Sequence, residues 1–230
     1  MAGCGGAAPS TGARSTAVPP ASASTTSASR SLPATSVRRL SRPPHRRRPR
    51  GPSPGTLPQT SVLPSARTRV FRAEMATLWR GIRSGSVGAA MPAFFPEAAY
   101  VQLKRIGDPQ GDWRGRLVAD YRLDVGAAHL LLAPHPGGAR LLTVQVPASY
   151  AHWVPPGVCD NAEGYYEVPN ARVVYRTGGG AIHSLGIASM ISWRGVWYVV
   201  HLGAVLRPAP DGVVDDPSAG AGVSAYSSTC

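Results

Sequence analysis

The stretch 181–206, AIHSLGIASMISWRGVWYVVHLGAVL, decides the fold because it has the pattern of two long β-strands joined by a tight turn. Residues 181–193 and 196–206 are the predicted strands. Arg194 and Gly195 between them form a two-residue connection typical of antiparallel hairpins. Nearly every residue in 196–202 is large or β-branched, which indicates a central strand. An antiparallel sheet is therefore expected at the end of the domain.

More strands are expected upstream of this hairpin. Residues 140–146 (RLLTVQV) form a strand that ends at Pro147. Residues 165–176 form another, interrupted by Pro169, whose missing N–H indicates an edge position or a bulge. The turn Thr177-Gly178-Gly179-Gly180 joins it to the closing hairpin. About four antiparallel strands are thus predicted.

Two helices are expected before the strands. Pro96 suits the first turn of a short helix that runs to about residue 106. Asp112 is the expected N-cap of a longer helix that stops at Pro134. An apolar stripe recurs along that helix every three or four residues, at Leu117, Tyr121, Val125, Ala128 and Leu132. Helices followed by strands predict an α+β fold, with two N-terminal helices packed on a curved antiparallel sheet.

Composition divides the chain into four parts. Residues 1–73 contain twelve Arg and no Lys, Asp or Glu, so they carry the whole formal net charge of +12. This stretch is poor in large apolar residues and is predicted to be a disordered tail. Residues 74–93 are expected to be a linker or weak helix, 94–207 the α+β domain, and 208–230 a second disordered tail.

The Arg-rich tail leaves three interpretations open. Clustered guanidinium groups at Arg46, Arg47, Arg48 and Arg50 would bind phosphates electrostatically. Nucleic-acid binding is disfavoured because no aromatic residues interleave with them and the rest of the chain is formally neutral. The second interpretation is a solvated linker. The third is that part of the tail is not made in the cell, because it comes from GC-rich DNA read upstream of a true start at Met75 or Met91.

The cysteines suggest a location outside the cytoplasm. Met1-Ala2-Gly3-Cys4 resembles a bacterial lipobox, although the charged and apolar segments that precede such a cysteine are missing. If the gene begins earlier, Cys4 would carry lipid and the protein would sit in the cell envelope; otherwise it is cytoplasmic. Cys159 and Cys230 would then be free to form a disulfide in an oxidising compartment. Alternatively, Cys159 is a loop thiol and Cys230 part of a frayed end.

The closing strand, Trp197-Tyr198-Val199-Val200-His201, resembles the last strand of SnoaL-type domains of the cystatin/NTF2-like fold. The resemblance covers residues 95–206. The runs Phe94-Phe95-Pro96-Glu97-Ala98-Ala99-Tyr100 and Ile191-Ser192-Trp193-Arg194-Gly195 are also similar to uncharacterised envelope proteins of high-GC Gram-positive bacteria. The NTF2-like resemblance implies a pocket between the helix and the concave side of the sheet.

Candidate residues for such a pocket fall into two groups. Asp124, His129 and His201 are the candidates for acid–base catalysis, since His titrates near neutral pH and a carboxylate fixes its tautomer. Candidates for contact with a ligand are Tyr121, Trp153, Tyr165 and Trp197. The alternative is that the histidines are hydrogen-bonded within the core and the aromatic residues only pack there.

Three functions remain open at this point. The first is a non-enzymatic binding or accessory domain for a small apolar ligand or another envelope protein. The second is a small NTF2-like isomerase, cyclase or hydrolase that uses a His/Asp pair. The third is nucleic-acid contact through the Arg-rich tail. No Cys-x-x-Cys or His/Cys cluster predicts a metal, and no glycine-rich nucleotide motif predicts a cofactor.

Overall fold

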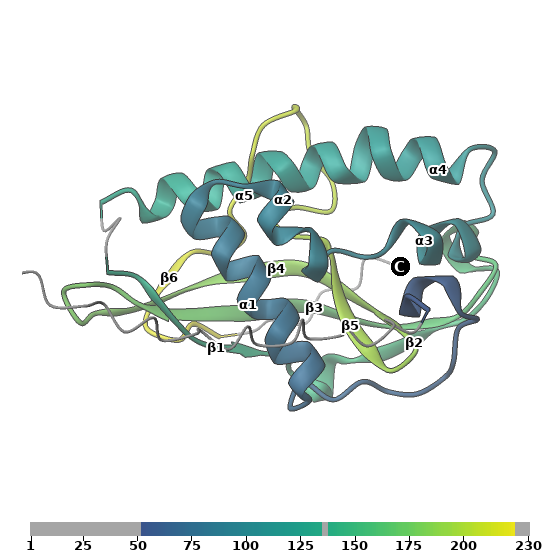
Figure 1. Ribbon diagram of the computed structural model, residues 1–230, viewed down its shortest axis with the longest axis horizontal. Coiled ribbons are helices and arrows are strands. Elements are labelled where there is room, and N and C mark those ends of the chain that lie inside the picture. Colours follow the sequence, from purple (N-terminus) through teal and green to yellow (C-terminus); the bar gives the residue numbers. More distant parts are fainter. Residues whose placement is uncertain (1–51, 135–137, 224–230) are drawn as a thin grey trace, which may run out of the picture. The chain divides into compact units, whose positions relative to one another are not determined.

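A computed structural model of the chain describes residues 52–134 and 138–223. Within these residues an antiparallel sheet has the strand order β1-β3-β4-β5, with β2 also paired to β3 and β6 paired to β4 (Figure 1). The strands are β1 Arg140–Gln145, β2 His152–Val154, β3 Tyr165–Arg176, β4 Ile182–Trp193, β5 Val196–His201 and β6 Ser218–Ala219. The α+β class and the curled antiparallel sheet predicted from the sequence are confirmed.

Two strand predictions differ from the structure. The run 196–202 is predicted as a central strand, but β5 lies at the end of the strand order. Pro169 agrees with the predicted edge position locally, because it lies between Glu167, which pairs with β2, and Arg172, which pairs with β1; the next residue, Asn170, has a left-handed backbone with φ of 45°. The closing strand was expected to continue to residue 206 but ends at His201. It ends there because the chain turns at Gly203, whose N–H donates to the buried Asp124 carboxylate over 2.8 Å.

The helical part contains more elements than the two helices expected. The α-helices are α1 Arg69–Ser84, α2 Val87–Ala90, α3 Glu97–Leu103, α4 Pro109–Asp112 and α5 Val118–Leu132, with a π-helical segment Trp113–Leu117 between the last two. Short 3₁₀ turns are Pro54–Thr56, Met91–Ala93, Ala148–Tyr150 and Val158–Asp160. Asp108 caps α4 by accepting from the Gly111 N–H, so the predicted N-cap, Asp112, is one turn too late.

Helix α1 corrects the predicted domain boundary at residue 94. Thr68 caps its first turn by accepting from the Phe71 N–H, and Gly85 ends it with φ of 64°. The helix buries one stripe of side chains at helical spacing, namely Phe71, Met75, Leu78, Trp79 and Ile82. Residues 74–84, predicted as a linker or weak helix, are thus helical and packed in the core, and the helix begins earlier, at Arg69 in the predicted tail. Residues 1–51 of that tail lie outside the described residues.

The two faces of the sheet are covered by different parts of the chain. On one face, Trp79 of α1 packs on Tyr175 with ring centroids 5.2 Å apart, and Phe95 packs on Tyr198 at 6.0 Å. Trp197, which neighbours Tyr198 and so faces the other side, donates its indole N–H to the Pro64 carbonyl. Figure 1 shows α5 running along one side of the sheet, and α1 crossing the sheet obliquely.

The segment after β5 is also folded where the structure describes it, contrary to the predicted disorder of 208–230. Val213 N–H donates to Asp124, and Gly186 N–H of β4 donates to the Asp215 carbonyl. The guanidinium of Arg172, which is fully buried, binds Asp216 at 2.9 Å and Ser184 at 2.7 Å. Residues 208–223 thus cover part of the sheet, and 224–230 lie outside the described residues.

The placement of α1 in the core can be tested by mutation. Leu78→Ala removes a fully buried side chain and should lower the free energy of unfolding by about 2–5 kcal/mol. Arg80→Ala, two residues along on the exposed side of the same helix, should change it by less than about 0.5 kcal/mol. Urea denaturation of both variants measures the difference. Equal, small losses would show that α1 does not pack as described.

Candidate functional site

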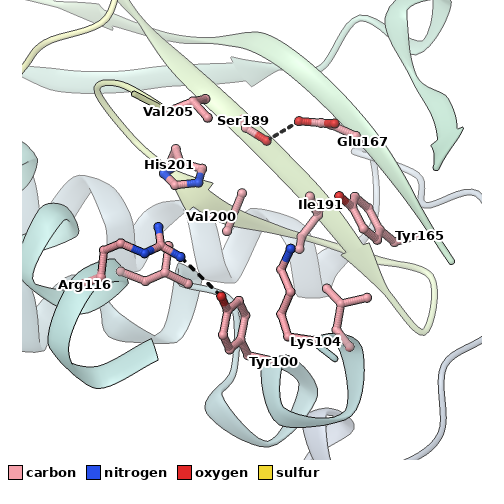
Figure 2. Close-up of a pocket in the computed structure, with 12 residues that line it drawn as sticks. Tyr100, Lys104, Arg116, Tyr165, Glu167, Ser189, Ile191, Val200, His201 and Val205 are labelled. Atoms are coloured by element: carbon pink, nitrogen blue, oxygen red, sulfur yellow. Dashed lines mark hydrogen bonds between the residues drawn. The ribbon is translucent and has the colours of Figure 1, made fainter. Parts of the chain in front are cut away.

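A pocket of about 100 Å³ lies between the helical side of the domain and strands β3, β4 and β5 (Figure 2). Its lining mixes hydrocarbon with polar and charged groups. The lining residues are Tyr100, Leu103, Lys104, Arg116, Leu117, Tyr165, Glu167, Ser189, Ile191, Val200, His201 and Val205. Concave sites that combine apolar surface with convergent polar groups are where small molecules usually bind, and here polar residues are in the majority.

Strand pairing builds the sheet wall of the pocket. Glu167 of β3 is opposite Ile191 of β4, and Ser189 of β4 is opposite His201 of β5. The register between β4 and β5 shifts between Ser189 and Met190, so Val200 bulges and both it and His201 line the pocket. Ser189 Oγ donates to Glu167 Oε1 over 2.7 Å, and Glu167 is buried.

The helical wall carries the cations. Arg116 lies in the π-helical segment, a distortion often found at functional sites. Its Nε and Nη2 donate to the two Asp112 oxygens at 2.7 and 2.6 Å, and Nη2 also donates to Tyr100 Oη. Lys104 follows the last residue of α3, and its Nζ donates to the Cys159 carbonyl over 2.8 Å.

Burial and these cations set the protonation of the pocket. Burial, followed by the nearby cations Arg116, Arg207 and Lys104, lowers the pKa of His201 from 6.5 to about 4. The ring is therefore neutral at pH 7, and its Nδ1 has no hydrogen-bond partner among the described residues. Burial, followed by the neighbouring Arg116, also lowers the pKa of Lys104. Burial raises the pKa of Tyr165 to about 12, so its hydroxyl keeps its proton.

The predicted catalytic residues are not brought together. The Asp124 carboxylate accepts from the Gly203 N–H, the Val213 N–H and Arg207 Nη2, at 2.6 to 2.9 Å, and none of its hydrogen bonds goes to His201. His129 Nδ1 lies 3.0 Å from the Ile82 carbonyl at the end of α1. Of the three candidates, only His201 lines the pocket.

The predicted ligand contacts are also divided between different environments. Tyr165 lines the pocket. Tyr121 is a core residue that stacks on Phe94 at 4.4 Å and donates to the Ala90 carbonyl. Trp153 is partly exposed and packs edge-on against Tyr166. Trp197 packs under residues 63–67 on the other face of the sheet.

Sequence reasoning missed five polar residues of the pocket, namely Tyr100, Lys104, Arg116, Glu167 and Ser189. A signal was present for two of them. Glu167 precedes Val168, and Ser189 lies between Ala188 and Met190, in segments predicted as strands; a polar residue buried there needs a polar partner or a solvent-filled site. Lys104 and Arg116 gave no comparable signal, because charged residues near helix ends are ordinarily solvated.

Cys159 is disulfide-bonded. The other two cysteines of the sequence, Cys4 and Cys230, lie outside the described residues, so the pairing of Cys159 with Cys230 and the lipidation of Cys4 stay predictions. No helix in the described ranges 52–134 and 138–223 is long and apolar enough to cross a membrane.

No protein-family model, curated protein or solved structure matches this chain.

The Asp124 hydrogen bonds have a measurable stability effect. Asp124→Ala leaves two backbone N–H groups and the largely buried Arg207 without their acceptor, and should cost about 3–5 kcal/mol of unfolding free energy. Asp120→Ala removes only a more exposed carboxylate 3.3 Å from Arg207 Nε and should cost at most about 1 kcal/mol. Urea titrations compare the two, and equal losses would contradict the central position of Asp124.

The buried, neutral His201 predicts a pH-dependent stability. The unfolded chain takes up the ring proton near pH 6.5 and the folded chain only near pH 4, so the His201 contribution is complete above pH 6.5 and is lost as the pH falls towards 4. His201→Gln should remove this loss. Glu74, whose pKa burial raises to about 8, acts in the opposite direction, because its contribution is lost as the pH rises from 4.5 to 8.

Unfolding free energies of the parent and of His201→Gln, measured from pH 7.5 to pH 4.5, isolate the His201 effect because Glu74 is present in both proteins. As the pH falls, the unfolding free energy of His201→Gln should rise relative to that of the parent. A difference that does not change with pH would contradict a neutral, buried ring.

Proposed function

We propose that this chain is a non-enzymatic small-molecule-binding domain of the cystatin/NTF2-like, SnoaL-type kind, and that its ligand occupies the His201 pocket. The observation that carries the proposal is the pocket itself, where the polar lining described above is joined by five apolar residues. These are Leu103, Leu117, Ile191, Val200 and Val205. Leu103, Leu117 and Ile191 are almost fully buried, so they form the rigid floor of the pocket, and the less buried Val200 and Val205 supply most of its accessible hydrocarbon.

The fold supports the family part of this proposal at the level of architecture. Helices pack on a curled antiparallel sheet, and the pocket lies between them, which is where the resemblance placed it. Attachment through Cys4 and a place in the cell envelope remain part of the proposal. Their support is the lipobox-like Met1-Ala2-Gly3-Cys4 and the disulfide bond at Cys159, which favours an oxidising compartment.

An enzyme is the second candidate because one observation favours it. His201 and Ser189 are cross-strand neighbours on one wall, and Ser189 is bound to Glu167. Asp124 would have no part in such chemistry, since its oxygens are occupied by Gly203, Val213 and Arg207. Conversion of a bound compound that stops in His201→Gln would favour the enzyme over the binding domain.

The binding site can be tested by filling the pocket. Val205 lines the pocket and is half-buried, so Val205→Trp should occupy part of it and weaken binding about tenfold or more. Leu206→Trp is the matched control, because Leu206 is 88% exposed and does not line this pocket. The probes are hexanol, hexylamine, hexanamide and hexanoate.

Chemical-shift titration of the full chain measures this binding. At least one probe should perturb the amide signals of Val200 and His201 in a saturable way, in the parent and in Leu206→Trp but not in Val205→Trp. The proposal fails if no probe binds, or if Val205→Trp binds as well as the parent.

A further inference from the structure

The outer side of α1 carries a row of four arginines. They are Arg69, Arg72, Arg80 and Arg83, and all four are exposed. The two pairs are separated by one turn at Ala76, so the four side chains return to the same side of a helix with 3.6 residues per turn. Between its first and last members the row extends for about 21 Å. In Figure 1, α1 lies in front of the sheet with no labelled helix or strand drawn over it.

No acidic side chain compensates this arginine row. None of its four guanidinium groups forms an ion pair within the described residues. All Asp and Glu residues of the chain lie in the described ranges, so the rest of the chain has no acidic side chain to supply. Glu74 is the one acidic residue of α1. It is partly buried and off the row, and burial raises its pKa to about 8, so it is mostly uncharged at pH 7.

The row is unfavourable for the helix by itself. Arg69 and Arg72 lie in the first turn, where the helix dipole favours negative charge, and that turn contains no acidic residue. Within each pair the like charges are three residues apart, so they are neighbours on the helix surface and repel each other. An anionic surface against the outer side of α1 would relieve both effects.

Exposed aliphatic side chains lie at both ends of the row. At the N-terminal end are Val70, which is 51% exposed, and Leu63, which is 48% exposed. At the C-terminal end, His129 Nδ1 of α5 lies 3.0 Å from the Ile82 carbonyl, and the next residue, Leu130, is 70% exposed. Cations bind lipid phosphates, and aliphatic side chains enter the acyl region below them. Aromatic side chains, on which nucleic-acid bases stack, are not among these exposed residues.

We propose that the outer side of α1 is a docking surface for an anionic lipid bilayer, whose phosphate headgroups bind the arginine row while the aliphatic side chains at its ends enter the hydrocarbon. The proposal is independent of the His201 pocket and of lipid at Cys4. A plane of phosphates suits a row about 21 Å long, which no single small anion could span. Residues 1–51, which precede this surface in the chain, contain nine Arg and no acidic residue, so the same partner would attract them.

The test measures binding of the full chain to lipid vesicles by sedimentation. Vesicles with equal parts of phosphatidylglycerol and phosphatidylcholine should bind the parent about tenfold or more tightly than phosphatidylcholine alone. Replacing all four arginines of the row by Gln should weaken binding to the anionic vesicles about tenfold or more, because each cation near such a surface contributes about fivefold. Leu130→Ser should weaken it about threefold or more, since the leucine no longer enters the hydrocarbon.

The matched control replaces four exposed arginines outside α1 by Gln. They are Arg105, Arg122, Arg140 and Arg176. This variant has the same net charge as the row variant and should keep most of the parent's affinity. Equal losses in the two variants would overturn the proposal, since net charge alone would then explain the binding.

Three other results would also contradict a lipid surface. The first is equal binding of the parent to anionic and neutral vesicles. The second is a row variant that loses affinity for a double-stranded oligonucleotide but not for vesicles, which would assign the surface to nucleic acid. The third is a row variant less stable to urea than the parent, because the arginines would then serve the fold, whereas removal of their repulsion should leave stability unchanged or slightly higher.

Discussion

The register of the β3–β4 hairpin is the constraint on which the rest of the fold depends. Strands β1 and β2 pair with β3, while β5 and β6 pair with β4, so every other strand takes its position from these two. Side chains alternate between the two faces of a sheet, so a shift of the strand pairing by one residue would move each side chain to the opposite face. Ile191 would leave the helical face and Ser192 would enter it. The same register places Glu167 and Ser189 on the pocket wall, so the core and the candidate site are specified together.

The buried carboxylate of Asp124 connects this sheet to the helical layer. Asp124 belongs to α5, and its partners Gly203, Arg207 and Val213 all come from the chain after β5. A carboxylate buried as deeply as that of Asp124 would be very unfavourable without hydrogen-bond donors. Here two backbone N–H groups and one guanidinium satisfy it. Gly203 follows His201 by two residues, so this connection also fixes the end of β5 at the pocket. Asp124, a catalytic candidate from its residue type, thus lies outside the pocket lining, and its hydrogen bonds define where the pocket strand β5 ends.

Sequence patterns predicted the strands well and the domain boundaries poorly, for a physical reason in each case. The hairpin at Arg194 and Gly195 was predictable because turn geometry and β-branched runs are local properties. Helix α1 was predicted only in part, as a linker or weak helix from residue 74, because its first residues lie in the Arg-rich stretch; the stripe from Phe71 to Ile82 nevertheless has clear helical spacing. The segment 208–223 gave no such pattern. It is ordered by partners far away in the sequence, above all Asp124 and β4, which no local pattern reveals.

The pocket was less predictable still, because its helical wall depends on a loop with an uncommon backbone. Cys159 and Asp160 both have positive φ, at 51° and 54°, which non-glycine residues adopt only when their surroundings hold them there. The chain around Lys104 provides that hold. Arg105 N–H donates to the Asp160 carbonyl, Ala162 N–H to the Leu103 carbonyl, and Lys104 Nζ to the Cys159 carbonyl. The last of these bonds holds the Lys104 amine on the helical wall of the pocket. The position of that amine therefore depends on a strained loop more than fifty residues further along the chain, and no local sequence pattern reveals such a contact.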